Sequence, residues 1–300
     1  MNKTRTRGKM TINKNTISVI CPSRGRQEQL LKMMNSARLS ADLPESIQFC
    51  IYIDDDDDGY NYSEEILKSL NIKFLQGPRF WLSGMFNSLL TIASGDFIFW
   101  CGDDVEFKTN GWDTKMKNEI LKFQDNICVV YVNDLANYPQ KYATIGMVHR
   151  DWVLLFGHVF TPHMRDNGID FWISDISRAI GRLIYLPDVH VEHLQFRQGK
   201  GELDGTYLDR IKSHKMYSPA SLYESLKDER RRDKLVLSYT TGIKLNKEPF
   251  RYLLANIYKK ISTPNLDVNR SIYIRSISNY RIITNFLSKY KILYSNKNWS

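Results

Sequence analysis

The segment that most constrains this chain is DFIFWCGDDVEF, residues 96–107. Four large apolar residues, 97–100, run without a polar break and lead through Cys101 and Gly102 to Asp103 and Asp104. A short, aromatic-rich apolar run of this kind is typical of a central strand in a sheet that helices cover on both faces. Because ligands of such sheets bind at the carboxyl ends of the strands, the two acids are expected at a binding site.

Paired carboxylates at the end of a buried strand favour a bound cation. Two like charges about 4 Å apart repel by roughly 1 kcal/mol in water and by about 4 kcal/mol in a partly buried site. Oxygen ligands select Mg²⁺ or Mn²⁺, so one of these ions is the predicted cofactor. The alternative for Asp103 and Asp104 is an ordinary Gly-Asp-Asp turn.

Composition predicts a soluble intracellular chain with one large domain and an appendage. No apolar run in the 300 residues approaches the roughly 18 residues of a membrane span. The first residues, MNKTRTRGKM, lack the apolar core of a signal peptide. No CxxC pair occurs, so the cysteines are predicted to be reduced core residues. They are Cys21, Cys50, Cys101 and Cys128.

The net charge of +9 is concentrated at the two ends of the chain. Residues 1–14 carry five Lys or Arg and no acid, and residues 244–300 carry eleven against Glu248 and Asp267. The rest of the chain is therefore net acidic. The basic ends fit nucleic acid, an anionic membrane surface, or no partner at all.

Strands and helices alternate along the first half of the chain. Strands are predicted at residues 17–22, 47–53, 72–77, 97–100 and 127–132, with helices between them and another helix around 172–181. This order predicts an α/β fold with a mostly parallel sheet. Ser63 and Ser218, the latter before Pro219, are predicted helix caps. The expected divisions are a basic tail (1–14), a main domain (15–210) and a basic, mainly helical C-terminal region (211–300).

Several spaced motifs within residues 16–205 resemble the GT-A glycosyltransferases, specifically family 2-like enzymes. The strand and turn ISVICPSRGR resemble the opening of that fold, and GDD resembles its DxD region with Gly102 in place of the first acid. ISDISRAIGRLIYLP is similar to the xED segment, and VEHL follows it. A bacteriophage and bacterial subset with GDDV, GWD and EH followed by GKGELD is closer still.

The resemblance implies roles for individual residues. Asp104 and His193 become the metal ligands, and Asp175 the catalytic base. Arg197 and Lys200, in a Gly-flanked loop, are expected to close over the phosphates. The residues assigned to the nucleotide-sugar are Pro22, Ser23, Arg24, Asp54, Asn87 and Asp103, together with Arg197 and Lys200. Trp112, Gly146 and Trp172 are the candidates for acceptor binding, the tryptophans by stacking on a ring.

Each of these residues has a simpler structural interpretation. Asp175 fits a surface ion pair with Arg178 at i+3, worth about 0.2–0.5 kcal/mol. His193 fits a satisfied core histidine, Trp112 and Trp172 fit core packing, and Gly146 fits a turn.

The predicted function is a metal-dependent, inverting glycosyltransferase that moves a sugar from a nucleotide-sugar, preferably a UDP-sugar, to a hydroxyl. The acceptor is either a membrane-associated glycan or a modified nucleic-acid base. The predicted location is the cytoplasm, with peripheral attachment to the inner membrane face, or the host cytoplasm if the chain is phage-encoded. The alternatives are a sugar nucleotidyltransferase and a non-catalytic basic adaptor that binds nucleic acid.

Overall fold

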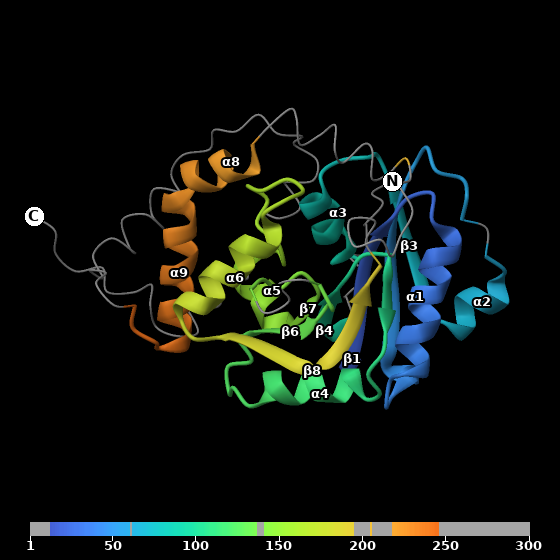
Figure 1. The fold of residues 1–300 in the computed structure, drawn as a ribbon, viewed down its shortest axis with the longest axis horizontal. Coiled ribbons are helices and arrows are strands. Elements are labelled where there is room, and N and C mark those ends of the chain that lie inside the picture. Colours follow the sequence, from blue (N-terminus) through green and yellow to red (C-terminus); the bar gives the residue numbers. More distant parts are fainter. Residues whose placement is uncertain (1–12, 61, 137–140, 195–204, 206–217, 246–300) are drawn as a thin grey trace, which may run out of the picture.

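The computed structural model describes residues 13–60, 62–136, 141–194, 205 and 218–245. These residues build one curved eight-stranded sheet in the order β3-β2-β1-β4-β7-β6-β8-β5, with helices on both faces (Figure 1). The α/β fold predicted from the alternating pattern is confirmed. The basic tail up to residue 12 and the C-terminal segment 246–300 lie outside the described residues.

One half of the sheet is parallel, as predicted. β1 pairs with β2 on one side and β4 on the other, and β2 pairs with β3, all in parallel. The polar ends of these strands therefore meet at one edge of the sheet. The strands are β1 (Asn13–Ser23), β2 (Ile47–Asp54), β3 (Ile72–Gly77) and β4 (Gly95–Trp100).

The other half of the sheet is mixed, which the alternation pattern did not reveal. β7 (Gly146–His149) lies antiparallel between β4 and β6 (Val129–Asn133). β8 (Leu183–His193) runs parallel to β6, and the short β5 (Val105–Phe107) pairs with its end in antiparallel fashion. The first part of β8 therefore lies beside β6, and its last residues reach β5 at the polar edge of the sheet.

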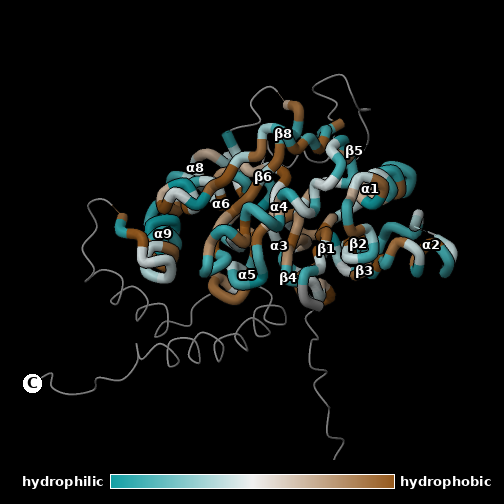
Figure 2. Tube along the Cα trace, turned by 90° about the horizontal axis from the view of Figure 1, so that it is seen from below, coloured by the Kyte–Doolittle hydropathy of each residue, from teal (hydrophilic) through white to brown (hydrophobic). Residues whose placement is uncertain are grey.

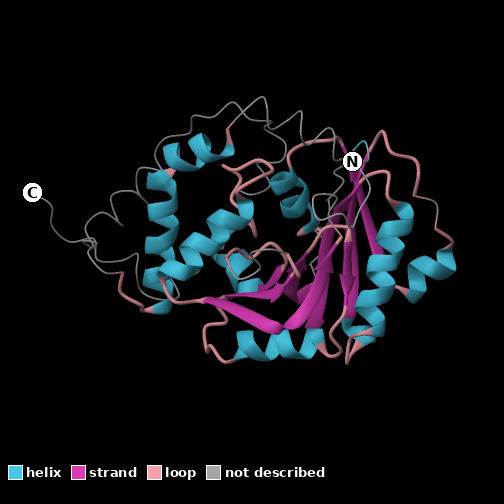
Figure 3. Ribbon diagram, in the orientation of Figure 1, coloured by secondary structure: helices cyan, strands magenta, loops and turns pink. Residues whose placement is uncertain are grey.

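Helices cover the two faces of the sheet, and Figure 3 shows the resulting layers. One core cluster joins a sheet face to α1 and α4, and a second joins the other face to α3, α5, α6 and α9. The strands carry the brown, hydrophobic stretches in Figure 2, whereas much of α9 is teal. The helices are α1 (Gln27–Leu39), α2 (Glu64–Ser69), α3 (Leu82–Leu89), α4 (Trp112–Leu121), α5 (Arg150–Phe156), α6 (Ile169–Ala179), α8 (Pro219–Ser225) and α9 (Lys227–Thr241), with a 3₁₀ turn at Pro44–Ser46.

Several local predictions are confirmed. All four cysteines are buried and free. Ser63 Oγ accepts a hydrogen bond from the Ile66 amide, and Ser218 Oγ accepts one from the Ser221 amide, so both serines cap their helices. No helix in the described part of the chain is long and apolar enough to span a bilayer.

Candidate active site

The candidate site forms where β4 ends and β5 begins. The buried strand β4 stops at Trp100, and the link to β5 contains Asp103 and Asp104. Val105 of β5 lies opposite His193 of β8, which brings the imidazole to the acid pair. His193 Nε2 lies 3.2 Å from Asp104 Oδ1. The structure therefore brings together the two residues that the family resemblance assigns to the metal.

Asp103 is buried and held by the turn that follows β1. Ser23 Oγ donates a hydrogen bond to its Oδ2 at 2.6 Å, and Arg26 Nη1 donates one to its Oδ1 at 2.9 Å. Burial raises the pKa of Asp103 to about 6, with Arg26 opposing the shift and Asp104 adding to it. Because each of its oxygens accepts a hydrogen bond within the protein, Asp103 holds the link between β4 and β5 in place.

Asp104 is the more accessible acid of the pair, with 27% of its side chain exposed against 6% for Asp103. Its Oδ1 faces His193, and its Oδ2 lies 3.8 Å from Arg26 Nη1. Burial acts to raise the pKa of Asp104, but His193 and Arg26 outweigh it and lower the pKa below its usual value. The Asp104 carboxylate therefore favours its charged form, which is the form that binds a cation.

Arg24 and Asp54 lie together on the other side of the same turn. Arg24 Nη1 donates to Asp54 Oδ2 at 2.8 Å, and its guanidinium also holds Asp56 by two hydrogen bonds. Asp54 is almost fully buried, and Arg79 Nε approaches it to 3.9 Å. Burial raises the pKa of Asp54, against the effect of both arginines. Arg24 thus organises the run of aspartates rather than the Asp103–Asp104 pair.

Two residues at this centre were not among the predicted site residues. Arg26 lies beside Arg24 in the turn and is the arginine that contacts the acid pair. Tyr60 ends the aspartate-rich loop, and its hydroxyl lies 2.6 Å from Ser23 Oγ and accepts a hydrogen bond from the Arg26 amide. The basic turn signalled Arg26, but no sequence pattern signals Tyr60. Pro22 lies at the end of β1, opposite Tyr52.

Asn87 holds a neighbouring loop. Its Nδ2 donates to the Phe160 carbonyl at 2.7 Å, and its Oδ1 accepts from the amides of Val159 and Phe160 at 3.1 and 3.2 Å. The amide group that was assigned to the nucleotide-sugar is therefore engaged by backbone. In this structure, Asn87 fixes the segment that leads from α5 toward α6.

The three residues assigned to the acceptor lie inside the protein. Trp112 is fully buried between β-sheet and helix, and its Nε1 donates to the Ala37 carbonyl. Trp172 is also buried, and its Nε1 donates to Asp233 Oδ2 at 2.8 Å. A side chain at Gly146 would meet the Trp100 ring and the Val130 carbonyl within 3 Å. Both tryptophans match the core-packing interpretation, and neither ring is open to a sugar. Gly146 begins β7 and is not in the turn expected for it.

Asp175 lies in the second turn of α6, because this helix begins at Ile169 and not around residue 172 as predicted. Its Oδ2 is 2.8 Å from Lys234 Nζ and 3.5 Å from Arg230 Nε, both on α9. The acid in the first turn of α6 is Asp170. The signal for this helix start is Gly168, which adopts a left-handed conformation at the N-cap.

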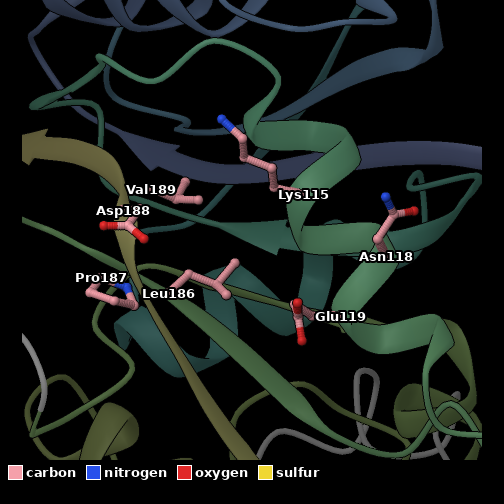
Figure 4. Close-up of a pocket in the computed structure, with 7 residues that line it drawn as sticks. All are labelled: Lys115, Asn118, Glu119, Leu186, Pro187, Asp188 and Val189. Atoms are coloured by element: carbon pink, nitrogen blue, oxygen red, sulfur yellow. The ribbon is translucent and has the colours of Figure 1, made fainter.

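The structure also has a cavity of about 320 Å³ between α4 and β8, shown in Figure 4. Lys115, Asn118 and Glu119 of α4 line it on one side, and residues 186–189 of β8 line it on the other. No predicted site residue lines this cavity, so it is separate from the acid pair. Arg197 and Lys200 lie outside the described residues.

Comparison with known proteins finds one solved structure that shares the fold and a second that is reported for its similarity alone. Among solved structures, the mannosyltransferase PcManGT from Pyrobaculum calidifontis, in complex with GDP-Man and Mn²⁺, is 11% identical, with 97% of this chain and 92% of that chain covered and a TM-score of 0.50. S. aureus TarS (residues 1–349) is 16% identical, with 75% and 81% covered and a TM-score of 0.44. No curated protein matches the sequence.

The family is shown by the sequence profile. The profile described as glycosyl transferase family 2 matches residues 18–177, more than half of the 300 residues. This span contains β1, the arginine-rich turn, the acid pair and most of α6. The GT-A-type fold seen in the sheet fits this match, and the chain therefore belongs to glycosyl transferase family 2.

Proposed function

We propose that this protein is a metal-dependent, inverting glycosyltransferase that moves a sugar from a nucleotide-sugar, preferably a UDP-sugar, to a hydroxyl acceptor. The observation that carries the proposal is the pairing of Asp104 with His193 beside the anchored Asp103, at the polar edge of a buried sheet. Ligands of open α/β sheets bind at such an edge.

Asp104 and His193 fit one side of a divalent-ion site. A carboxylate oxygen and an imidazole nitrogen 3.2 Å apart are chemically suitable ligands for Mn²⁺. Among the described residues no group of three or more His, Cys, Asp and Glu side chains gathers as a complete site, so donor phosphates and water would supply the other ligands. When bound, Mn²⁺ or Mg²⁺ neutralises negative charge on the diphosphate leaving group. The mannosyltransferase complex with GDP-Man and Mn²⁺ supports this reading.

The nucleotide is assigned to the turn after β1 and the aspartate-rich loop. Ser23 donates to Asp103 there, Arg24 donates to Asp54 on the other side of the turn, and Pro22 directly precedes both donors, beside β2. Fixed side chains of this kind orient a donor without reorganising when it binds. Arg197 and Lys200 keep their proposed role at the phosphates.

We assign the general base to Asp170 in place of Asp175. A base must reach the acceptor hydroxyl. Side chains of a helix tilt toward its N-terminus, so an acid in the first turn lies at that end of the helix. Asp170 is in that turn, whereas Asp175 forms ion pairs with α9. A base on the acceptor side implies attack opposite the nucleotide, and hence inversion.

Two classes of acceptor are proposed for the transferred sugar, a membrane-associated glycan and a modified nucleic-acid base. Both derive from the basic ends of the sequence. Firm binding to anionic vesicles together with weak, unsaturable DNA binding would eliminate the nucleic-acid class. Saturable DNA binding without vesicle binding would eliminate the glycan class.

The experiment that tests the proposed reaction is a screen of UDP- and GDP-sugars for Mn²⁺-dependent hydrolysis by the full chain. We expect release of a nucleoside diphosphate from one donor, and loss of that release with EDTA. Release of pyrophosphate from a sugar phosphate and a nucleoside triphosphate would instead establish a nucleotidyltransferase. No turnover of any donor, with DNA binding that survives Asp104→Ala, would favour the adaptor.

A further inference from the structure

Arg26 contacts both acids of the pair from the N-cap position of α1. Its Nη1 donates to Asp103 Oδ1 at 2.9 Å and lies 3.8 Å from Asp104 Oδ2. Only 14% of the Arg26 side chain is exposed, so this positive charge acts in a partly desolvated place. Coulomb interactions are several-fold stronger there than in bulk water.

The position of Arg26 conflicts with a divalent ion on Asp104. One oxygen of Asp104 faces His193 Nε2, and the other faces Arg26 Nη1. An ion bound by Asp104 and His193 would therefore lie within a few ångströms of the guanidinium, and like charges repel at that distance. The acid pair is already neutralised in part by Arg26, which lowers its need for a cation.

The two contacts of Arg26 differ in kind. The bond to Asp103 is a charged hydrogen bond of normal length to a buried carboxylate. The 3.8 Å approach to Asp104 is too long for a hydrogen bond, and Asp104 is the more exposed acid. The guanidinium can therefore leave Asp104 at little cost. A guanidinium is also well suited to a phosphate, which arginine binds in a bidentate manner.

We propose that Arg26 is a displaceable counter-cation of the acid pair. It keeps the affinity of Asp104 and His193 for a free divalent ion low, and it turns to the diphosphate when a nucleotide arrives with the ion. This inference rests on the proposed function, since it assumes that Asp104 binds the metal. Its consequence is that metal and nucleotide bind cooperatively, and that the empty enzyme does not retain metal.

Arg24 provides a matched control within the same turn. It carries the same charge two residues away, but its guanidinium is bound by Asp54 and Asp56. Arg24→Gln removes one positive charge from the turn and leaves the contact to Asp104 in place. Arg26→Gln removes the charge but keeps an amide donor for Asp103, and Arg26→Lys keeps the charge.

The first measurement is binding of Mn²⁺ alone to the full chain, followed by the EPR signal of free Mn²⁺. Arg26→Gln is expected to bind Mn²⁺ about tenfold more tightly than the wild type, since a repelling charge is removed. Arg26→Lys and Arg24→Gln should stay within about twofold of the wild type, and Asp104→Asn should bind much more weakly. Thermal unfolding confirms that each variant is folded.

Unchanged or weaker Mn²⁺ binding in a folded Arg26→Gln, with binding lost in Asp104→Asn, would overturn the counter-cation while leaving the metal site intact. If Asp104→Asn binds Mn²⁺ like the wild type, Asp104 is not a metal ligand, and both the proposed metal site and the inference are wrong. These outcomes separate failure of the inference from failure of the proposed function.

The second measurement is binding of UDP and of GDP, each titrated separately at saturating Mn²⁺. Arg26→Gln should bind the preferred nucleotide about tenfold more weakly, because a phosphate contact is lost, and Arg26→Lys should recover part of the affinity. Equal affinities of Arg26→Gln and the wild type would overturn the transfer of Arg26 to the diphosphate.

Discussion

His193 Nε2 lies 3.2 Å from Asp104 Oδ1, although the two residues are far apart in the sequence. The short ladder between β5 and β8 produces this contact, because Val105 pairs with His193 in register. The backbone reinforces it, since the Leu194 amide donates to the Asp104 carbonyl at 2.8 Å. The position of His193 therefore depends on three residues of β5 that hold the end of β8.

Replacement of Asp104 by Asn should weaken Mn²⁺ binding strongly and reduce turnover by about 10³-fold, as expected when a preorganised charged group is lost. The protein should remain folded, because this side chain is partly exposed and Asn has nearly the same size and shape as Asp. Isothermal titration with Mn²⁺ and donor hydrolysis measure the two effects. Asp55→Asn is the control, because Asp55 is an exposed acid in the aspartate-rich loop. Equal losses in both variants would contradict a specific role for Asp104.

Asp170→Asn should lower kcat by about 10²–10⁴-fold with little change in donor binding, which is the effect of losing a general base. Asp175→Asn is the matched variant in the same helix. It should keep most of the turnover and lose about 1 kcal/mol or less of stability, because its ion pairs to Lys234 and Arg230 are partly exposed. Steady-state kinetics and thermal unfolding distinguish them. If Asp175→Asn loses turnover and Asp170→Asn keeps it, Asp175 is the general base.

The sequence predicted the parallel half of the sheet well because its strands are short apolar runs with polar ends. Residues 72–77 form β3 with the predicted bounds, and 47–53 forms β2 with one additional residue. β5 has only three residues, and β7 occurs in a segment that reads equally well as a loop. Both strands form because they pair in antiparallel fashion with segments far away in the sequence. The local residue pattern does not predict such pairing.

The candidate site was predicted in part for a similar reason. Asp103, Asp104 and Ser23 follow strand ends directly, so their meeting at the sheet edge was expected. The partners of side chains on helices depend on how the helices pack, which a single sequence does not reveal. Asn87 on α3 and Asp175 on α6 therefore resembled site residues but bind a loop and α9 respectively. Burial of Trp112 and Trp172 has the same cause.

Trp112→Ala should destabilise the protein by about 3–5 kcal/mol, the usual cost of deleting a buried aromatic side chain. The Trp112 ring packs against Phe99 and Phe107, with centroids 5.0 and 4.6 Å away. Leu121→Ala on the same helix should cost much less, because Leu121 is half exposed. Chemical denaturation measures both. A change in acceptor KM without loss of stability would contradict the core role of Trp112.

Asn87→Ala should destabilise the protein by about 1–3 kcal/mol, because the amides of Val159 and Phe160 would lose their acceptor. This loop precedes α6, so hydrogen exchange should rise at residues 159–160 and spread toward the start of the helix. Ser88→Ala on the same helix is the control and should leave exchange unchanged. If Asn87 instead contacts the donor, the variant would lose donor affinity and keep wild-type exchange at the loop. Exchange followed by mass spectrometry, together with donor titration, decides between these two roles of Asn87.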